Sequence, residues 1–158
     1  MPKRSASDWV LEALALAALA TIIATVAAYW TELPAQVPRH FGISGSPDGW
    51  GNKNGMLMLP LTAIGLYILI TVTSRYQRLI NVPMSIDRDA PEVQRLLQSM
   101  SITLKMVLLF VFVYIEWAKV NTALGRSAGL GKLFMPISLV AVFIPLGLYL
   151  QKLRGHQK

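Results

Sequence analysis

The sequence has no cysteine and little charge. The absence of Cys among its 158 residues excludes disulfides, thiolate catalysis and cysteine-ligated zinc sites. Charged residues make up 15% of the chain, whereas a typical soluble domain carries about 25%. The sequence also contains no recognisable Ser-His-Asp set, phosphate-binding glycine loop or paired-carboxylate site. We therefore expect a protein that is not an enzyme, with no catalytic residues and no cofactor.

Apolar residues take the place of the missing charge, and they are concentrated in long blocks. They make up 54% of the chain. About 20 apolar helical residues cross a bilayer hydrocarbon core about 30 Å thick, and blocks of this length occur at about 9–30, 55–74, 99–118 and 132–150. The sequence therefore predicts a single membrane domain, residues 1–158, with an all-α fold: an integral membrane bundle of four transmembrane helices.

The first and last blocks need a closer reading. Lys3 and Arg4 precede the first block, as in a cleaved signal peptide, but the uncharged stretch 13–30 is longer than the usual signal core of about 7–15 residues. Glu12 is expected to lie near the membrane interface without a specific role. Pro136 and Pro145 interrupt the last block, where neighbouring helices can bond to the carbonyls that they free. We interpret both blocks as transmembrane helices.

The distribution of Lys and Arg predicts the orientation, because short cytoplasmic loops are enriched in them. With four spans, both termini and the second loop share one side, which holds nine basic residues: Lys3, Arg4, Arg75, Arg78, Arg88, Arg95, Lys152, Arg154 and Lys158. The other side holds five: Arg39, Lys53, Lys119, Arg126 and Lys132. This bias predicts a multi-pass protein of the cell membrane with both termini cytoplasmic and the loop 31–54 outside.

The net charge of +7 does not indicate nucleic-acid binding. The basic residues flank apolar spans instead of lining one soluble face, and attraction to anionic lipid head groups explains that placement. We therefore expect membrane lipids, and no nucleic acid, as partners.

The second loop contains a helix start signal. Acidic and capping residues at 86–89 precede Pro91, which predicts a helix from about Ala90 that continues into the third span. We interpret its first turns as an amphipathic lead-in on the membrane surface. A docking face for a cytoplasmic partner is the alternative.

The loop of residues 31–54 is rich in residues that restrict or reverse the backbone. Pro34 and Pro38 favour extended geometry, and the Ser-Pro-Asp-Gly run at 46–49 is typical of a type I turn. Glycines at four positions permit further turns. We expect a compact extracytoplasmic loop that folds back on the helix ends, with an apolar set of anchors: Leu33, Val37, Phe41 and Trp50.

This loop resembles a known family through Leu33-Pro34, Val37-Pro38, His40-Phe41, Gly45, Pro47-Asp48-Gly49-Trp50 and Lys53. The run, at fixed spacing directly after a transmembrane helix, is similar to the N-terminal membrane domain of SdpI-type proteins, a domain of unknown function, over roughly residues 21–75. The family includes bacterial immunity proteins against a secreted peptide toxin, and some members are implicated in signalling by sequestering a repressor at the membrane. Longer members carry further spans, so the resemblance implies a stand-alone N-terminal domain.

The polar loop residues each allow a structural and a functional interpretation. We expect His40 to pair with Asp48 or with a loop carbonyl. Metal binding or proton exchange, with Glu32 as a third ligand, is the alternative; because no His-x-x-x-His spacing supports it, we predict no metal site. Lys53 should pair with Asp48 or with carbonyls, or else contact an acidic ligand. Trp50 is interpreted as an interface anchor, with a ligand platform as the alternative.

Two charged residues fall within the third span. Lys105 lies near its cytoplasmic end, so its ammonium is expected to snorkel to the interface. Glu116 lies near the outer end, and ionisable residues inside a membrane are candidates for function. We expect Glu116 to be solvated or paired with Lys119; the alternative is a contact with the first loop, through Arg39 or His40.

Three functional hypotheses follow. The first is a non-enzymatic binding or sensing protein of the SdpI-like type, whose partner is a secreted peptide, a lipid or another membrane protein. Its candidate binding residues are Pro38, His40, Phe41, Gly45, Asp48, Gly49, Trp50 and Lys53. The second is a structural or accessory subunit of a larger membrane complex. The third is a small transporter or membrane enzyme that uses Glu116, His40 and Asp48.

Overall fold

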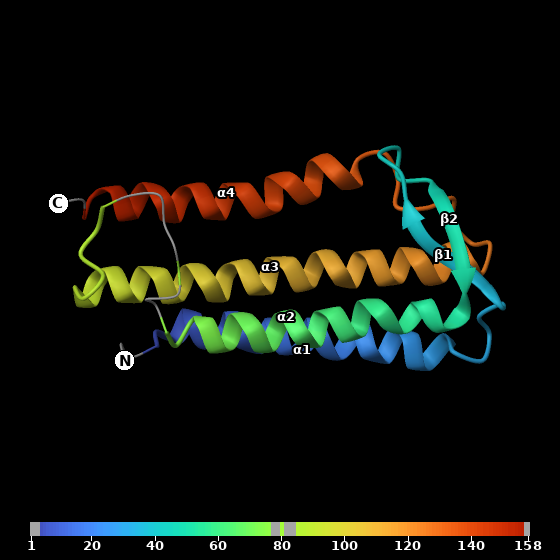
Figure 1. Ribbon diagram of the computed structural model, residues 1–158, viewed down its shortest axis with the longest axis horizontal. Helices are drawn as coiled ribbons and strands as arrows, with labels where there is room; N and C mark the ends of the chain where they lie inside the picture. The colour runs from blue at the N-terminus through green and yellow to red at the C-terminus, as the bar shows by residue number, and fades with distance from the viewer. Residues whose placement is uncertain (1–3, 77–79, 81–84, 157–158) are drawn as a thin grey trace.

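In the part of the chain that the structure describes, four long helices lie side by side, and a β-hairpin lies at one end of the bundle (Figure 1). The computed structural model describes residues 4–76, 80 and 85–156; Lys3, Arg78 and Lys158, counted above for orientation, lie outside them. In chain order the elements are α1 (Ala6–Tyr29), β1 (Gln36–Phe41), β2 (Pro47–Asn52), the 3-10 helix η1 (Lys53–Leu57), α2 (Met58–Thr73), α3 (Pro91–Ala123) and α4 (Phe134–Arg154). The start of α1 and the end of α4 lie opposite the hairpin.

The predicted spans are present as four helices that are long and apolar enough to cross a membrane. Counting η1 with α2, they contain 24, 21, 33 and 21 residues, with mean hydropathies between 1.8 and 2.2. In each helix, at most 33% of an apolar stretch of 18 residues is buried inside the protein, and in α4 the buried share is 0%. Large apolar side chains therefore cover the outside of the bundle, where water would disfavour them. These helices indicate a multi-pass membrane protein.

Capping residues explain where α1 and α3 begin. Ser5 and Asp8 form a capping box, in which each side chain accepts a hydrogen bond from the other residue's backbone N–H. Pro91 is the first residue of α3, where its missing N–H removes no helical bond. The helix start predicted near Ala90 is confirmed. From there α3 continues for 33 residues to Ala123, so the predicted span 99–118 is the middle of a longer helix.

The predicted all-α class needs a correction at residues 31–54, which contain a two-stranded antiparallel sheet. The chain reverses before β2: the Gly42 N–H donates to the Ser46 carbonyl over 2.9 Å, and Gly45 has a φ of +79°. The type I turn predicted at 46–49 is wrong because Pro47 and Gly49 lie in β2. A proline is tolerated there because it is the first residue of the strand.

Three apolar clusters lie along the bundle. The middle one joins α1, α2 and α3 through Ala15, Ala18, Ile22, Ala63 and Leu109. The cluster at the hairpin end contains Val26, Leu33, Val37, Met56 and Val120. The cluster at the opposite end contains Val93, Leu97, Met100 and Leu153. Leu33, just before the hairpin, and Val37, on β1, were expected to anchor the loop at the membrane interface; both are instead buried in the cluster at the hairpin end.

The loop between α3 and α4 docks on the tip of the hairpin through its backbone. The Leu130 N–H donates to the Gly45 carbonyl over 2.7 Å. A Cβ on Gly129, whose φ is +138°, would overlap that same carbonyl oxygen, and a Cβ on Gly45 would overlap the backbone of Gly131. Because the atoms in the way belong to the backbone, they cannot rotate aside, and the contact requires glycine on both loops.

This contact predicts that Gly129→Ala lowers the free energy of unfolding by about 1–3 kcal/mol, since the new Cβ is strained both by φ and by overlap. Reversible unfolding in detergent measures the change. Gly147→Ala is the matched control, because its Cβ would meet no atom within 4 Å and helix propensity favours alanine by up to about 1 kcal/mol. Equal stability of Gly129→Ala and the unmodified protein would contradict the docking.

Candidate functional site

The hairpin contains a bulge at Arg39. The register shifts between Pro38 and His40, so Arg39 has no partner residue in β2, as expected for an extra residue in one strand. The aliphatic part of Arg39 lies against two glycines: a Cβ on Gly51 would overlap its Cδ, and one on Gly55 would lie 3.6 Å from its Cγ. These glycines leave the space through which Arg39 crosses the hairpin.

His40 and Asp48 face each other across the hairpin, as the sequence predicted. The His40 Nδ1 lies 2.5 Å from the Asp48 Oδ1. Glycines beside the pair leave room for it, because a Cβ on Gly49 would lie 3.2 Å from the His40 Cβ and one on Gly42 would lie 3.1 Å from the Asp48 Oδ2. Both side chains are exposed. Exposed pairs contribute at most about 1 kcal/mol to stability, so this one orients His40 more than it stabilises the fold.

Lys53 does not pair with Asp48, which was one of its two predicted structural partners. Its ammonium lies 4.9 Å from the centroid of the Trp30 ring, a cation–π contact, and its backbone N–H donates to the Ala35 carbonyl. Asp48 lies near the start of β2 and Lys53 follows its end, so the four strand steps from Asp48 to Asn52 already separate them by about 13 Å at about 3.3 Å per residue. Trp50 is half-exposed on β2.

A cavity of about 330 Å³ lies where the hairpin meets α2, α3 and the start of α4. Its hairpin side is formed by Arg39, His40 and Phe41, and its other walls by Gly55, Met58, Leu59, Thr62, Ile115, Lys119, Leu130, Phe134 and Met135. Arg39, Lys119 and the imidazole of His40 are therefore placed around a largely apolar floor. Of the predicted binding residues, the cavity brings together His40 and Phe41.

Glu116 and Lys119 form an ion pair beside this cavity. The Lys119 Nζ lies 3.3 Å from the Glu116 Oε2, one helical turn apart on α3. Glu116 is fully buried, so the ion pair predicted for it is present and the solvated alternative is wrong. Among the described residues it pairs with neither Arg39 nor His40, and its Oε1 has no hydrogen-bond partner. Lys119 thus lines the cavity and pairs with a buried counter-ion.

Lys105 differs most from its prediction, because it does not snorkel. Only 1% of its side chain is exposed, and its ammonium donates to the Glu12 Oε1 over 2.6 Å and to the Thr71 Oγ1 over 2.8 Å. The Tyr67 hydroxyl donates to the same Glu12 oxygen over 2.6 Å, and the Arg4 guanidinium lies 3.4 Å from the Glu12 Oε2. This cluster, which joins α1, α2 and α3, gives Glu12 a role that the sequence analysis missed.

One signal in the sequence points to that cluster. Glu12 and Lys105 have opposite charges and lie in different spans, each near the end of its span that faces the termini. Two such charges at similar depth are expected to pair, because an unpaired charge in a membrane is costly. The cluster lies toward the termini, at the opposite end of the bundle from the hairpin cavity.

The hairpin cavity has the chemistry of a binding site. Arginine and lysine side chains attract carboxylate or phosphate groups, and an apolar floor accepts hydrocarbon. Within residues 4–76, 80 and 85–156, no three His, Asp or Glu side chains come together in a way that could hold a metal ion. The arrangement therefore suits a ligand with one anionic and one apolar part.

Comparison with known proteins finds relatives without a stated role. Residues 16–64 match the family model described as Domain of unknown function (DUF1648); this region spans the second part of α1, the hairpin, η1 and the start of α2. An "Uncharacterized protein" of Archaeoglobus fulgidus is 29% identical over 136 residues, which are 76% of this chain and 73% of that protein. No solved structure matches. The hairpin, the second part of α1 and the start of α2 are thus the part of this chain that is similar to DUF1648.

Proposed function

We propose that this membrane protein is a non-enzymatic binding or sensing protein whose loop of residues 31–54, which contains the hairpin, recognises a partner at the membrane surface. The observation that carries the proposal is the cavity of about 330 Å³ beneath the hairpin, which combines Arg39, His40 and Lys119 with an apolar floor. Its partner carries an anionic group on an apolar body. A lipid head group and the carboxylate of a membrane-bound peptide or protein share this chemistry.

The electrostatics of the cavity support an anionic ligand. Arg39 is exposed, and no described carboxylate forms an ion pair with it. Lys119 is buried, and its charge is compensated by Glu116, which does not line the cavity. A second anion can therefore approach Arg39 and Lys119 without displacing an existing partner. Apolar walls strengthen this attraction because they lower the local dielectric.

The biological role that we propose is immunity-like or signalling-like, and it rests on the resemblance of the hairpin to SdpI-type proteins. Such a role requires the hairpin to face the outside of the cell membrane and both termini to face the cytoplasm. In that orientation a secreted peptide reaches the cavity directly, while the termini and the second loop remain available to cytoplasmic partners.

The orientation is testable with a single engineered cysteine, because the chain contains none of its own. We expect Ser46→Cys, exposed next to the hairpin turn, to react with a membrane-impermeant maleimide in intact cells. His156→Cys, beside Glu92 at the start of α3 and two residues beyond the end of α4, should react only after the cells are opened. The reverse labelling pattern would contradict the proposed orientation.

Ligand binding is testable with dodecyl phosphate as the probe, added to the full chain in a neutral detergent. We expect Arg39→Gln to weaken its binding about tenfold, since a hydrogen bond to a charged group contributes about 1.5–3 kcal/mol. Tryptophan fluorescence follows the titration. Arg126→Gln is the matched control, because Arg126 is similarly exposed, pairs with Glu32 and lies outside the cavity. Equal dissociation constants in both variants and the unmodified protein would overturn the proposal.

A further inference from the structure

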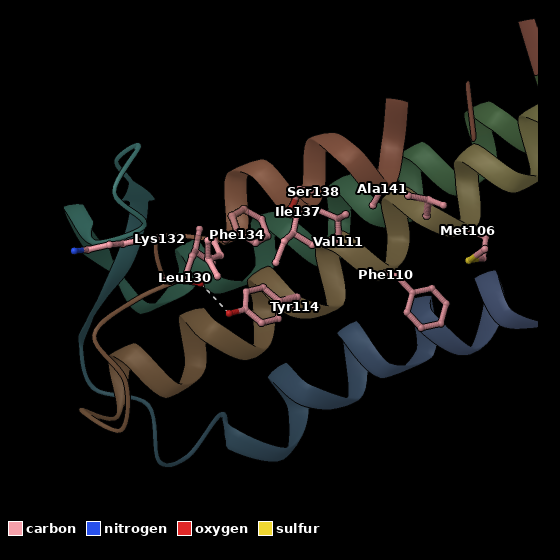
Figure 2. Close-up of a pocket in the computed structure, with 13 residues that line it drawn as sticks. Met106, Phe110, Val111, Tyr114, Leu130, Lys132, Phe134, Ile137, Ser138 and Ala141 are labelled. Carbon is pink, nitrogen blue, oxygen red and sulfur yellow. Dashed lines mark hydrogen bonds between the residues drawn. The ribbon is translucent and has the colours of Figure 1, made fainter. Parts of the chain in front are cut away.

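A second, larger cavity lies between α3 and the hairpin half of α4. It is a groove of about 610 Å³, and its walls include Phe110, Tyr114, Ile137 and Ala141 (Figure 2). The Tyr114 hydroxyl, one of its few polar groups, already donates to the Leu130 carbonyl over 2.8 Å. The groove therefore presents a nearly continuous hydrocarbon surface to whatever fills it.

The groove exists because α4 is held to α3 mainly at its C-terminal end. There Leu153 belongs to a buried cluster with the start of α3, Leu150 packs against it, and Tyr149 lies within hydrogen-bonding distance of Thr103. Pro145, inside α4, removes the helical hydrogen bond to the residue four positions earlier, which permits a bend. On the hairpin side of Pro145 the two helices enclose the groove.

The length and depth of the groove match one leaflet of a bilayer. Its α3 wall extends from Met106 to Tyr114, and eight helical steps of about 1.5 Å give about 12 Å. Half of a hydrocarbon core is about 15 Å. Since α3 and α4 are both membrane-spanning helices, the groove lies at the depth of acyl chains, in the leaflet on the hairpin side.

A lysine side chain lies at the end of the groove that is nearest to the hairpin. Lys132 lines this end, is exposed, and extends its ammonium away from the apolar walls (Figure 2). It forms no ion pair with any of the residues that the structure describes. Lysines at the membrane surface attract anionic head groups, so the charge lies where the head group of a lipid in the groove would be.

We propose that the groove between α3 and α4 is a binding site for one anionic phospholipid, with an acyl chain against Phe110, Ile137 and Ala141 and the phosphate at Lys132. This site is independent of the proposed function. It lies on the other side of Leu130 and Phe134, which form part of the walls of both cavities. The phospholipid fills the space that protein side chains leave open between the two helices.

Native mass spectrometry of the full chain, released from nanodiscs of phosphatidylglycerol or phosphatidylcholine, tests the proposal. We expect the unmodified protein to retain one phosphatidylglycerol. Ala141→Phe fills the groove and should abolish retention, whereas Val140→Phe, the matched control on the exposed face of α4, should not. Lys132→Gln should weaken the preference for phosphatidylglycerol about fivefold, because one surface lysine contributes about 1 kcal/mol to binding of anionic lipid.

Three results would overturn the proposal. Undiminished retention by a folded Ala141→Phe variant would show that the lipid lies elsewhere, and equal retention of the two lipids by the unmodified protein would remove the role of Lys132. A lipid-free dimer that dissociates in Ala141→Phe would show that a second copy of the chain covers the groove. If Ala141→Phe does not fold, the proposal is tested with Lys132→Gln, because the Lys132 side chain is exposed. An unchanged preference for phosphatidylglycerol in this variant would then overturn the proposal.

Discussion

The ion pair between Glu12 and Lys105 is the contact on which the arrangement of the first three helices depends. In water, burial of apolar side chains would drive the helices together, but inside a bilayer the lipid tails are equally apolar and this driving force is lost. Polar contacts and close packing must then select which helix faces meet. Glu12 on α1, Lys105 on α3, and Tyr67 and Thr71 on α2 meet at one point. Either charge alone at that depth would be strongly unfavourable.

The two ends of the bundle are held by different means, and this difference places the candidate sites. Near the termini, charge pairing fixes α1 to α3, and apolar packing holds the end of α4. At the hairpin end, the backbone contact between Gly45 and Leu130 joins the two loops. Between these two fixed ends α4 is covered little by the rest of the protein. The groove lies between these two ends, and the hairpin cavity lies at the hairpin end itself, where α4 begins.

The proposed function and the inferred lipid site use the same physical pattern. In each, cationic side chains lie at the edge of an apolar surface, near the level where a membrane meets water. Arg39 and Lys119 occupy that place in the hairpin cavity, and Lys132 occupies it in the groove. The apolar parts of the two sites differ in shape: the first lies beneath the hairpin, and the second follows the helices into the bilayer.

Much of the fold could be predicted from the sequence, because long apolar blocks and helix start signals are local. The helix that begins at Pro91 and the pairing of His40 with Asp48 are examples. The opposite charges of Glu12 and Lys105 at similar depth are a signal for their pairing, but Tyr67 and Thr71 could not be assigned to the same cluster, because the rest of each span is apolar and does not indicate which face meets another helix. The type I turn predicted at 46–49 is wrong because proline can be the first residue of a strand and glycine can lie within one. The docking at Gly129 could not be predicted either, because it depends on contact between two loops that are far apart in the sequence.

A double-mutant cycle on Glu12 and Lys105 tests this account most directly. Glu12→Gln, Lys105→Met and the double variant would be unfolded reversibly in mixed detergent micelles. The account predicts that each single change lowers the free energy of unfolding by about 3 kcal/mol or more, because it leaves buried Lys105 without its carboxylate or buried Glu12 with Arg4 as its remaining cation. The double change should then cost about 2 kcal/mol less than the sum of the two. Single changes that cost less than about 0.5 kcal/mol and add without coupling would contradict it.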